Sequence, residues 1–225
     1  MNPIVACTKV SKTYLQGKLK VVALQDIDLS VKPGGFVALA GPSGSGKTTL
    51  LNLIGSLDRP DSGQIVVNGQ DYSSLTPAKM AELRLRNIGF VFQSYNLIPV
   101  LSALENVEYV MLLQSVPKKQ RQERALKVLE DVGLQGLMGR RPAELSGGQQ
   151  QRVAVARAIA SNPSIVLADE PTANLDSTTG EGLLEMMKGM NQNSGVTFIF
   201  STHDRMVMDF ADQVVTIRDG RIMED

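Results

Sequence analysis

The chain is poor in several residue types, and each shortage excludes a class of protein. Its 225 residues include one cysteine, Cys7, so an internal disulfide is impossible and a reducing compartment is expected. Basic and acidic residues number 23 each, so no net charge attracts nucleic acid. No apolar run approaches the roughly 20 residues that cross a bilayer, and no basic-then-apolar targeting pattern opens the chain. We expect a cytoplasmic protein that binds no nucleic acid and reaches membranes only through partners.

The most informative segment that is present runs from Gly41 to Thr48, with the sequence Gly-Pro-Ser-Gly-Ser-Gly-Lys-Thr. An apolar, strand-length run (36–40) precedes it, and a helix-like run (49–54) follows. Its glycines allow a tight turn that points N–H groups at phosphate oxygens, and the helix adds the positive end of its dipole. Lys47 should reach the β- and γ-phosphates, and the Thr48 hydroxyl should hold Mg²⁺. The strand-before, helix-after context disfavours an ordinary glycine-rich turn. The predicted nucleotide contacts are Gly41, Ser43, Gly44, Ser45, Gly46, Lys47, Thr48 and Thr49.

An acidic pair follows the next strong strand candidate, residues 164–168. In open α/β sheets, ligands bind at the carboxyl ends of the strands. Asp169 is therefore a candidate Mg²⁺ ligand, in the manner of phosphate-loop ATPases. Glu170 is free to polarise the attacking water as a general base. A solvated Asp-Glu pair that merely ends a strand is the alternative, and the phosphate loop upstream disfavours it.

A second anion site is predicted at Leu145-Ser-Gly-Gly-Gln149. Pro142-Ala-Glu144 stops any preceding helix, and residues 150–160 have helical periodicity. Ser146, Gly147, Gly148 and Gln149 thus lie at a helix N-terminus, where N–H groups and a hydroxyl can bind an anion. A serine helix cap without a ligand is the alternative. The following Gln149, Arg152 and Arg157, and the acidic strand just downstream, disfavour it. Because one compact domain cannot bring both glycine-rich sites to one nucleotide, the pair predicts ATP sandwiched between two copies of the chain.

The order of these motifs resembles that of the ATP-binding-cassette ATPases, from about residue 4 to the C-terminus. The resemblance implies roles for residues that match further family motifs. Gln93, after the strand-like run 88–92, matches the glutamine that senses Mg²⁺ and the attacking water. Asp176, in Asn174-Leu175-Asp176, matches the loop that crosses the dimer and links its two sites.

Two further residues match the family at positions where a simpler explanation exists. His203, the only histidine, follows the run 196–200 and matches the switch histidine that contacts the γ-phosphate. A lone histidine is otherwise most often a surface or core residue. Tyr14 matches the aromatic that stacks on adenine, although a tyrosine on an edge strand commonly just packs.

The predicted fold class is α/β in a single domain spanning residues 1–225. A phosphate-loop (RecA-like), mostly parallel sheet forms its core. The resemblance adds an N-terminal antiparallel β subdomain, seen in the β-type segments of residues 4–31 around a turn at 15–20, and an inserted helical subdomain at about 94–160. Residues 118–132 read as an amphipathic helix whose charges form a solvated face. Its apolar positions are 125, 126, 128, 129 and 132. A final strand or hairpin is expected at 213–218.

Within the family, the short chain resembles the lipoprotein-release, macrolide-exporter and cell-division branch. The segments 95–99 and 149–152 carry this resemblance, and no regulatory domain is expected after the last strand. It implies an integral-membrane permease as partner and a location on the inner face of the cell membrane. We expect the apolar loop 95–101 to form part of the groove that receives the permease. Packing of this loop into the core is the alternative.

Three other functions are compatible with an ATP-binding cassette. Cassette ATPases of DNA repair or chromosome structure need a long coiled coil, and no sustained heptad run exists here. Ribosome-acting members resemble two cassettes in tandem, and one set of motifs is present. An ATP-dependent, non-transport scaffold of the cell-division type remains, and the intact Glu170 and His203 argue against it.

Overall fold

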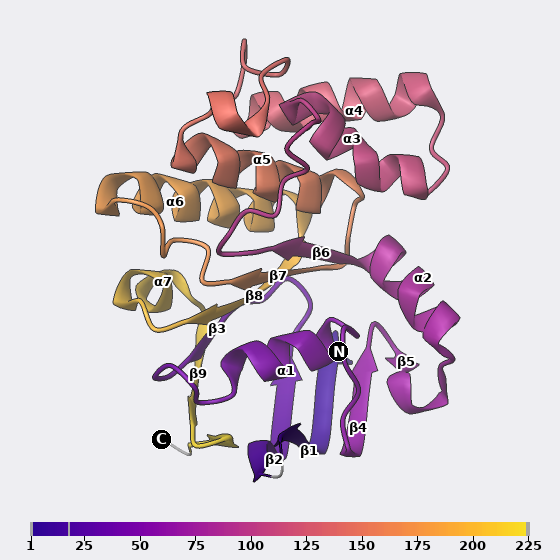
Figure 1. Ribbon diagram of the computed structural model, residues 1–225, viewed down its shortest axis with the longest axis vertical. Helices are drawn as coiled ribbons and strands as arrows, with labels where there is room; N and C mark the ends of the chain where they lie inside the picture. The colour runs from indigo at the N-terminus through magenta and orange to yellow at the C-terminus, as the bar shows by residue number, and fades with distance from the viewer. Residues whose placement is uncertain (1, 18, 224–225) are drawn as a thin grey trace.

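The computed structural model describes residues 2–17 and 19–223 and contains two sheets (Figure 1). The larger sheet has the order β10-β9-β3-β8-β7-β6, in which β9, β3, β8, β7 and β6 are parallel and β10 is antiparallel to β9. Every residue of β3 and β8 is buried, as expected for central parallel strands covered on both faces. The strands are β3 (Phe36–Ala40), β6 (Ile88–Val91), β7 (Ile165–Asp169), β8 (Thr197–Thr202), β9 (Gln213–Arg218) and β10 (Arg221–Ile222).

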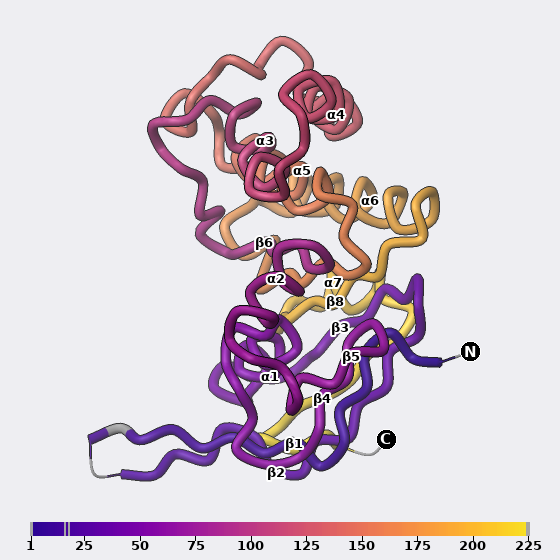
Figure 2. Tube along the Cα trace, turned by 90° about the vertical axis from the view of Figure 1, so that its right-hand side faces the viewer, coloured from indigo at the N-terminus to yellow at the C-terminus, as the bar shows by residue number. Residues whose placement is uncertain are grey.

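The smaller sheet is antiparallel, with the order β2-β1-β4-β5. It consists of β1 (Val5–Gln16), β2 (Leu19–Val31), β4 (Ser62–Val67) and β5 (Gln70–Asp71). Figure 2 shows that β1 and β2 extend beyond the body of the molecule as a long hairpin. The predicted β segments of residues 4–31 are therefore present, and Lys18 of their turn lies outside the described residues.

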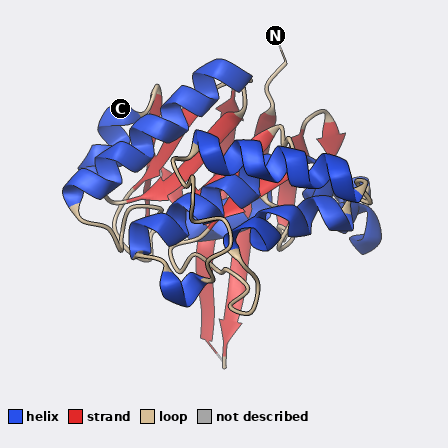
Figure 3. Cartoon of the chain, turned by 90° about the horizontal axis from the view of Figure 1, so that it is seen from above, coloured by secondary structure: helices blue, strands red, loops and turns tan. Residues whose placement is uncertain are grey.

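Helices cover both faces of the parallel sheet (Figure 3). On one face, α1 (Lys47–Ile54) lies in an apolar cluster that also includes residues of the antiparallel sheet and of α2 (Pro77–Asn87). On the other face, α6 (Ser177–Ser194) and α7 (Arg205–Phe210) pack over Phe36, Phe198 and Phe200. Short 3₁₀ turns occupy Tyr72–Ser74 and Pro142–Glu144. Together with the two sheets, this arrangement confirms the predicted fold class.

The remaining helices form a layer with a third apolar cluster. They are α3 (Ala103–Leu113), α4 (Lys118–Asp131) and α5 (Gly147–Ala160). Ala125, Val128 and Leu129 of α4 are buried as predicted, but Leu126 is 38% exposed. The prediction of a solvated charged face is also wrong at Arg121. Its guanidinium lies 3.7 Å from the Glu108 carboxylate, and both side chains are largely buried. Within the described residues, no helix combines the length and apolarity needed to cross a membrane.

Candidate functional site

Four of the predicted motifs meet at the carboxyl edge of the parallel sheet. The phosphate loop follows β3, Asp169 ends β7, His203 follows β8, and Gln93 lies two residues after β6. Because β3, β8, β7 and β6 are neighbours in this order, their ends lie side by side. They line a cavity of about 460 Å³ that includes residues 43–49, Gln93, Asp169, Glu170 and His203.

The phosphate loop has the geometry that its glycines predict. Gly46 adopts a φ of 107°, and a Cβ atom there would lie 2.5 Å from the carbonyl oxygen of Ala23, so no other residue fits. The Lys47 ammonium is buried and donates to the carbonyl oxygens of Gly41 and Pro42, at 2.8 and 2.9 Å. These bonds hold the lysine over the loop, where phosphate oxygens would be stronger acceptors.

Thr48 and Asp169 are 121 positions apart in the sequence but lie side by side in the fold. The Thr48 hydroxyl donates to Asp169 Oδ1 at 3.0 Å. A hydroxyl and a carboxylate are hard oxygen donors, and Mg²⁺ is commonly held by one or two such protein groups together with substrate phosphates. The residues present therefore fit a magnesium ion bound beside the phosphate loop.

Glu170 lies in a strained backbone conformation next to His203. Its φ is 46°, which is uncommon for a residue with a side chain and is typical of functional sites. Glu170 Oε1 lies 2.7 Å from His203 Nδ1, and Oε2 accepts a long hydrogen bond of 3.4 Å from the Thr202 hydroxyl. Only 16% of the Glu170 side chain is exposed, whereas the His203 ring is 67% exposed. The carboxylate is thus oriented by its neighbours while the imidazole faces the cavity.

The cavity has an apolar wall that the sequence reasoning missed. Val21, Val22 and Ala23 of β2 line it, although Val21 and Val22 are otherwise largely exposed. Tyr14 pairs with Val21 across the hairpin but does not line the cavity. Its hydroxyl donates to Asp58 at 2.8 Å. Burial and the nearby Asp58 raise the Tyr14 pKa. The place of this wall depends on the pairing register of β1 and β2, which sets Val21 opposite Tyr14 and which no motif in the sequence indicates.

The second predicted anion site, Leu145–Gln149, is called the signature motif below, and it lies outside this cavity. Ser146 is the N-cap of α5, and its hydroxyl accepts from the Gln149 N–H at 3.3 Å while Gln149 Oε1 accepts from the Ser146 N–H at 2.9 Å. Ser146 is nevertheless exposed, so the cap and an anion-binding role are compatible. Gly147 and Gly148 lie close to other chain segments: a Cβ on Gly147 would lie 2.9 Å from the Tyr95 hydroxyl, and one on Gly148 would lie 2.5 Å from Thr179 Cγ2.

Asp176 also lies outside the cavity, at the N-terminus of α6. Its carboxylate accepts from the N–H of Thr179 at 3.0 Å and from the Thr179 hydroxyl, and these bonds lower the Asp176 pKa. In the preceding turn, the Asn174 amide donates to the carbonyl oxygen of Gln93 at 2.8 Å. The loop that contains Asp176 is thereby tied to the loop that contains Gln93.

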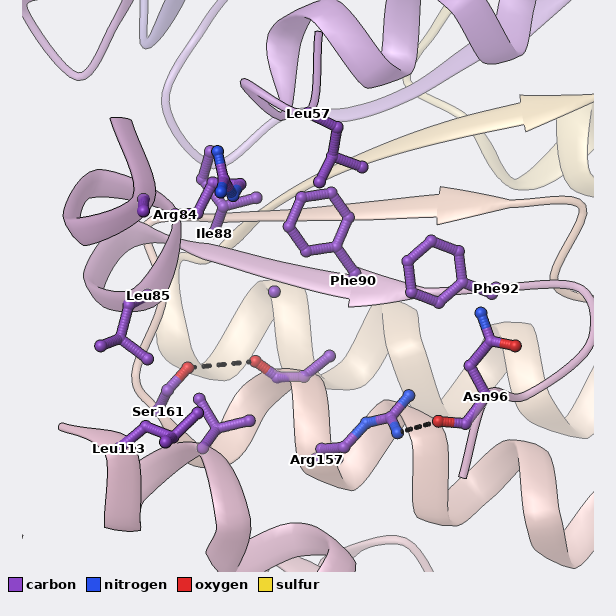
Figure 4. A pocket seen from close by; sticks show the side chains of 14 residues that line it. Leu57, Arg84, Leu85, Ile88, Phe90, Phe92, Asn96, Leu113, Arg157 and Ser161 are labelled. Atoms are coloured by element: carbon purple, nitrogen blue, oxygen red, sulfur yellow. Dashed lines mark hydrogen bonds between the residues drawn. The ribbon is translucent and has the colours of Figure 1, made fainter. Parts of the chain in front are cut away.

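The apolar loop 95–101 packs in part against the helical layer, and its role in a groove for the permease stays a prediction. Leu97 packs against the apolar cluster of the helical layer. Asn106, which is fully buried, accepts from the Ile98 N–H and donates to the carbonyl oxygens of Ile98 and Leu101. Val100 is 70% exposed. An apolar groove of about 500 Å³ lies next to the loop, between α2, β6, α3 and α5 (Figure 4), and Asn96 is the loop residue that lines it. Leu97 is thus partly buried, whereas Val100 lies on the surface.

The architecture has solved counterparts among ATP-binding cassettes. The dimeric post-hydrolysis structure of the ATP-binding cassette MJ0796 bound to ADP and Pi has a TM-score of 0.91 and 42% identity, and the match covers 98% of this chain and 97% of that one. The structure of cbiO1 from Clostridium perfringens has a TM-score of 0.90 and 27% identity, and covers 100% of this chain and 88% of that one. Fold and site together define a phosphate-loop nucleotide-binding protein.

Sequence comparison then gives the family. The profile of the ABC transporter family matches residues 24–173. An uncharacterized ABC transporter ATP-binding protein of Thermotoga maritima is 48% identical over 99% of this chain and 94% of its own length. The macrolide export ATP-binding/permease protein MacB of Syntrophobacter fumaroxidans is 50% identical over 95% of this chain but only 30% of its own length. The chain belongs to the ABC transporter family and is one of its ATP-binding-cassette ATPases.

Proposed function

We propose that two copies of this chain close around two ATP molecules, with each site completed by the signature motif of the other copy. The main support for this proposal is that the phosphate-loop cavity and the signature motif of one chain lie apart. Lys47, Thr48, Asp169 and Glu170 share one cavity, while the exposed N-terminus of α5 at Ser146 lies outside it. The dimeric structures of the related cassette MJ0796 support a two-fold arrangement of this kind.

In this proposal the residues of the cavity have distinct tasks. The loop backbone and Lys47 bind the phosphates, Tyr14 stacks on the adenine beside Val21, its cross-strand neighbour, and Glu170 polarises the attacking water. His203 and Gln93 set the geometry at the γ-phosphate. Thr48 and Asp169 would hold Mg²⁺, with Gln93 nearby, and the ion would neutralise charge on the phosphate oxygens. Positioning and electrostatics supply most of the catalysis in phosphoryl transfer, so no covalent nucleophile is required.

We further infer that hydrolysis drives a separate integral-membrane permease. Relatives of the MacB type carry an ATP-binding part and a permease part in one polypeptide, and this chain matches about a third of their length. The chain would then act on the inner face of the cell membrane, in an export or force-transmitting system. Closing and opening of the ATP-bound dimer would move the attached permease.

The shared site is tested by comparing three single variants. Lys47→Ala should abolish ATP binding, whereas Ser146→Arg should abolish hydrolysis and leave binding of a fluorescent ATP analogue to the monomer unchanged. Ser102→Arg is the matched control, because Ser102 caps α3 with the same reciprocal bonds but lies away from any nucleotide. If Ser146→Arg instead removed ATP binding by the monomer, the signature would belong to its own chain's site and the proposal would fail.

A further inference from the structure

A network of side chains ties the outer part of the β1–β2 hairpin to the loop that follows α1. Up to Ser11, β1 pairs with β2 on one side and with β4 on the other. After Ser11 it pairs with β2 alone, and the hairpin extends from the body of the molecule (Figure 2). A ribbon of two strands is only marginally stable by itself. The position of Tyr14 on this ribbon therefore depends on contacts other than strand pairing.

Asp58 lies at the centre of the network. Its Oδ2 atom accepts from the Tyr14 hydroxyl at 2.8 Å, and its Oδ1 atom accepts from the Lys12 ammonium at 3.0 Å. The backbone N–H of Arg59 also donates to Oδ1, at 2.7 Å. Both carboxylate oxygens are thus engaged, which fixes the direction of the carboxylate. Asp58 can hold the Tyr14 hydroxyl in one place because Lys12 and Arg59 hold Asp58 from the other side.

Lys12 contacts both the acidic groups and the aromatic ring. Its ammonium donates to the carbonyl oxygen of Arg59 at 2.6 Å and lies 3.7 Å from the Asp61 carboxylate. It also lies over the Tyr14 ring, 5.1 Å from the ring centre, within the range of a cation–π contact. The Lys12 side chain is only 11% exposed, whereas Tyr14 is 39% exposed. The ammonium therefore covers one face of the ring, and the ring keeps exposed surface for a ligand.

The ring is held at the edge of the nucleotide cavity. Tyr14 lies opposite Val21, which lines the cavity together with Val22. Burial and the hydrogen bond to Asp58 raise the pKa of Tyr14, and the side chain of Thr49, in the first turn of α1, lowers it in part. The Tyr14 hydroxyl is thus anchored close to the helix that follows the phosphate loop.

We infer that Asp58 and Lys12 are positioning residues that hold the Tyr14 ring for stacking on the base of the nucleotide. This inference rests on the proposed function, in which Tyr14 stacks on adenine, and adds the residues that set the ring in place. Stacking depends on the distance and tilt of the ring. A ring that is fixed before the nucleotide arrives loses less conformational freedom on binding, which strengthens the complex. The alternative is a structural network that only holds β1 against the body of the molecule.

The test compares the affinities for two ligands in the presence of Mg²⁺, measured by isothermal titration calorimetry. One is AMP-PNP, an ATP analogue that is not hydrolysed, and the other is inorganic tripolyphosphate, which has the phosphates but no base. Asp58→Ala removes the acceptor of the Tyr14 hydroxyl. We expect its Kd for AMP-PNP to rise about fivefold or more, within the range for a lost base–aromatic stack, and its Kd for tripolyphosphate to stay unchanged.

Asp61→Ala is the matched control for Asp58→Ala. Asp61 belongs to the same cluster, but it accepts from the Thr13 N–H and lies near Lys12 rather than bonding to the Tyr14 hydroxyl. The ratio of its two Kd values should equal that of the wild type. An equal loss of affinity for both ligands in Asp58→Ala, or the same loss in Asp61→Ala, would overturn the inference.

Tyr14→Phe tests the same hydrogen bond from its other end. This variant removes the hydroxyl but keeps the ring and the pair of Lys12 and Asp58, so the charges of the cluster stay balanced. Its Kd for AMP-PNP, and not for tripolyphosphate, should rise several-fold. If Asp58 acts through the hydroxyl, the double variant of Tyr14→Phe and Asp58→Ala should bind AMP-PNP about as weakly as Asp58→Ala alone. Wild-type affinity of Tyr14→Phe, or additive losses in the double variant, would contradict the inference.

Tyr14→Ala separates this inference from the proposed function. If the ring stacks on the base, this variant should lose affinity for AMP-PNP and keep its affinity for tripolyphosphate. Should Tyr14→Ala lose that affinity while Asp58→Ala and Asp61→Ala behave alike, the network would be structural only, and the proposed stacking would stand without it. Wild-type binding of AMP-PNP by Tyr14→Ala would overturn both the stacking role of Tyr14 and the inference built on it.

Discussion

In our proposal, the two residues at the end of β7 have different tasks. Asp169 still belongs to the strand, while Glu170 turns into the left-handed region and points its carboxylate toward His203. Adjacent residues of an ordinary strand would face opposite sides of the sheet. The turn at Glu170 explains how two consecutive carboxylates can serve two tasks in one cavity, one beside Thr48 and the other beside His203.

Glu170→Gln tests the second of these tasks. The amide keeps the shape of the side chain but cannot accept a proton, so hydrolysis should fall by roughly 10²–10⁴-fold, the usual effect of losing a general base. ATP affinity should be retained. Steady-state phosphate release and equilibrium nucleotide binding on the same preparation measure both, with Glu181→Gln on the exposed face of α6 as the control. Wild-type turnover in Glu170→Gln would refute the assignment.

Most candidate site residues could be predicted from the sequence. Asp169 ends an apolar strand and His203 directly follows one, while Lys47 and Thr48 belong to a glycine-rich motif between such a strand and a helix. Val21 and Val22 could not be predicted, because they reach the cavity only through the pairing register of β1 and β2. The same limit applies to Tyr14: its type suggested stacking, but the position of its ring depends on the hairpin and on Asp58.

At the level of secondary-structure elements, α5 can approach α6 closely because residue 148 of α5 is a glycine. A methyl group on Gly148 would lie 2.5 Å from Thr179 Cγ2, too close for two carbon atoms. Gly148→Ala should therefore lower the free energy of unfolding by about 1–3 kcal/mol, as overpacking usually does, despite the higher helix propensity of alanine.

Thr179→Ser should rescue that variant. Serine removes the offending methyl group and keeps the hydroxyl that bonds to Asp176. Urea unfolding of both single variants and the double variant gives the interaction energy. If the double variant were as unstable as Gly148→Ala alone, the contact with Thr179 would not be the reason for the glycine.

A second prediction at this scale concerns the stability contributed by the loop 95–101. Leu97 packs against the cluster of the helical layer, so Leu97→Glu buries a charge without a partner and should lower the melting temperature by several degrees or more. Val100→Glu should change it little, because Val100 is 70% exposed. Differential scanning calorimetry compares the two. Equal melting temperatures of the two variants would mean that Leu97 does not contribute to the core and would favour the docking role predicted from the sequence.

At the scale of the whole molecule, the sequence predicts an α/β sheet core with a helical insertion, and the structure has this fold. Strands such as 36–40 were predictable because both of their faces are buried, which makes them continuously apolar. The groove between α2, β6, α3 and α5 could not be predicted. Its lining residues are spread from position 57 to position 161, and no short motif contains them. Sequence patterns locate motifs, whereas grooves arise from packing between distant elements.

In the proposed function, one chain holds two half-sites that only a second copy can unite. The decisive measurement is the molar mass of the Glu170→Gln variant by light scattering after gel filtration, with and without Mg-ATP. We predict twice the monomer mass with Mg-ATP and the monomer mass without nucleotide, and we predict that adding Ser146→Arg restores the monomer while ATP remains bound. A Glu170→Gln protein that binds ATP yet stays monomeric, or a dimer that survives Ser146→Arg, would contradict this account.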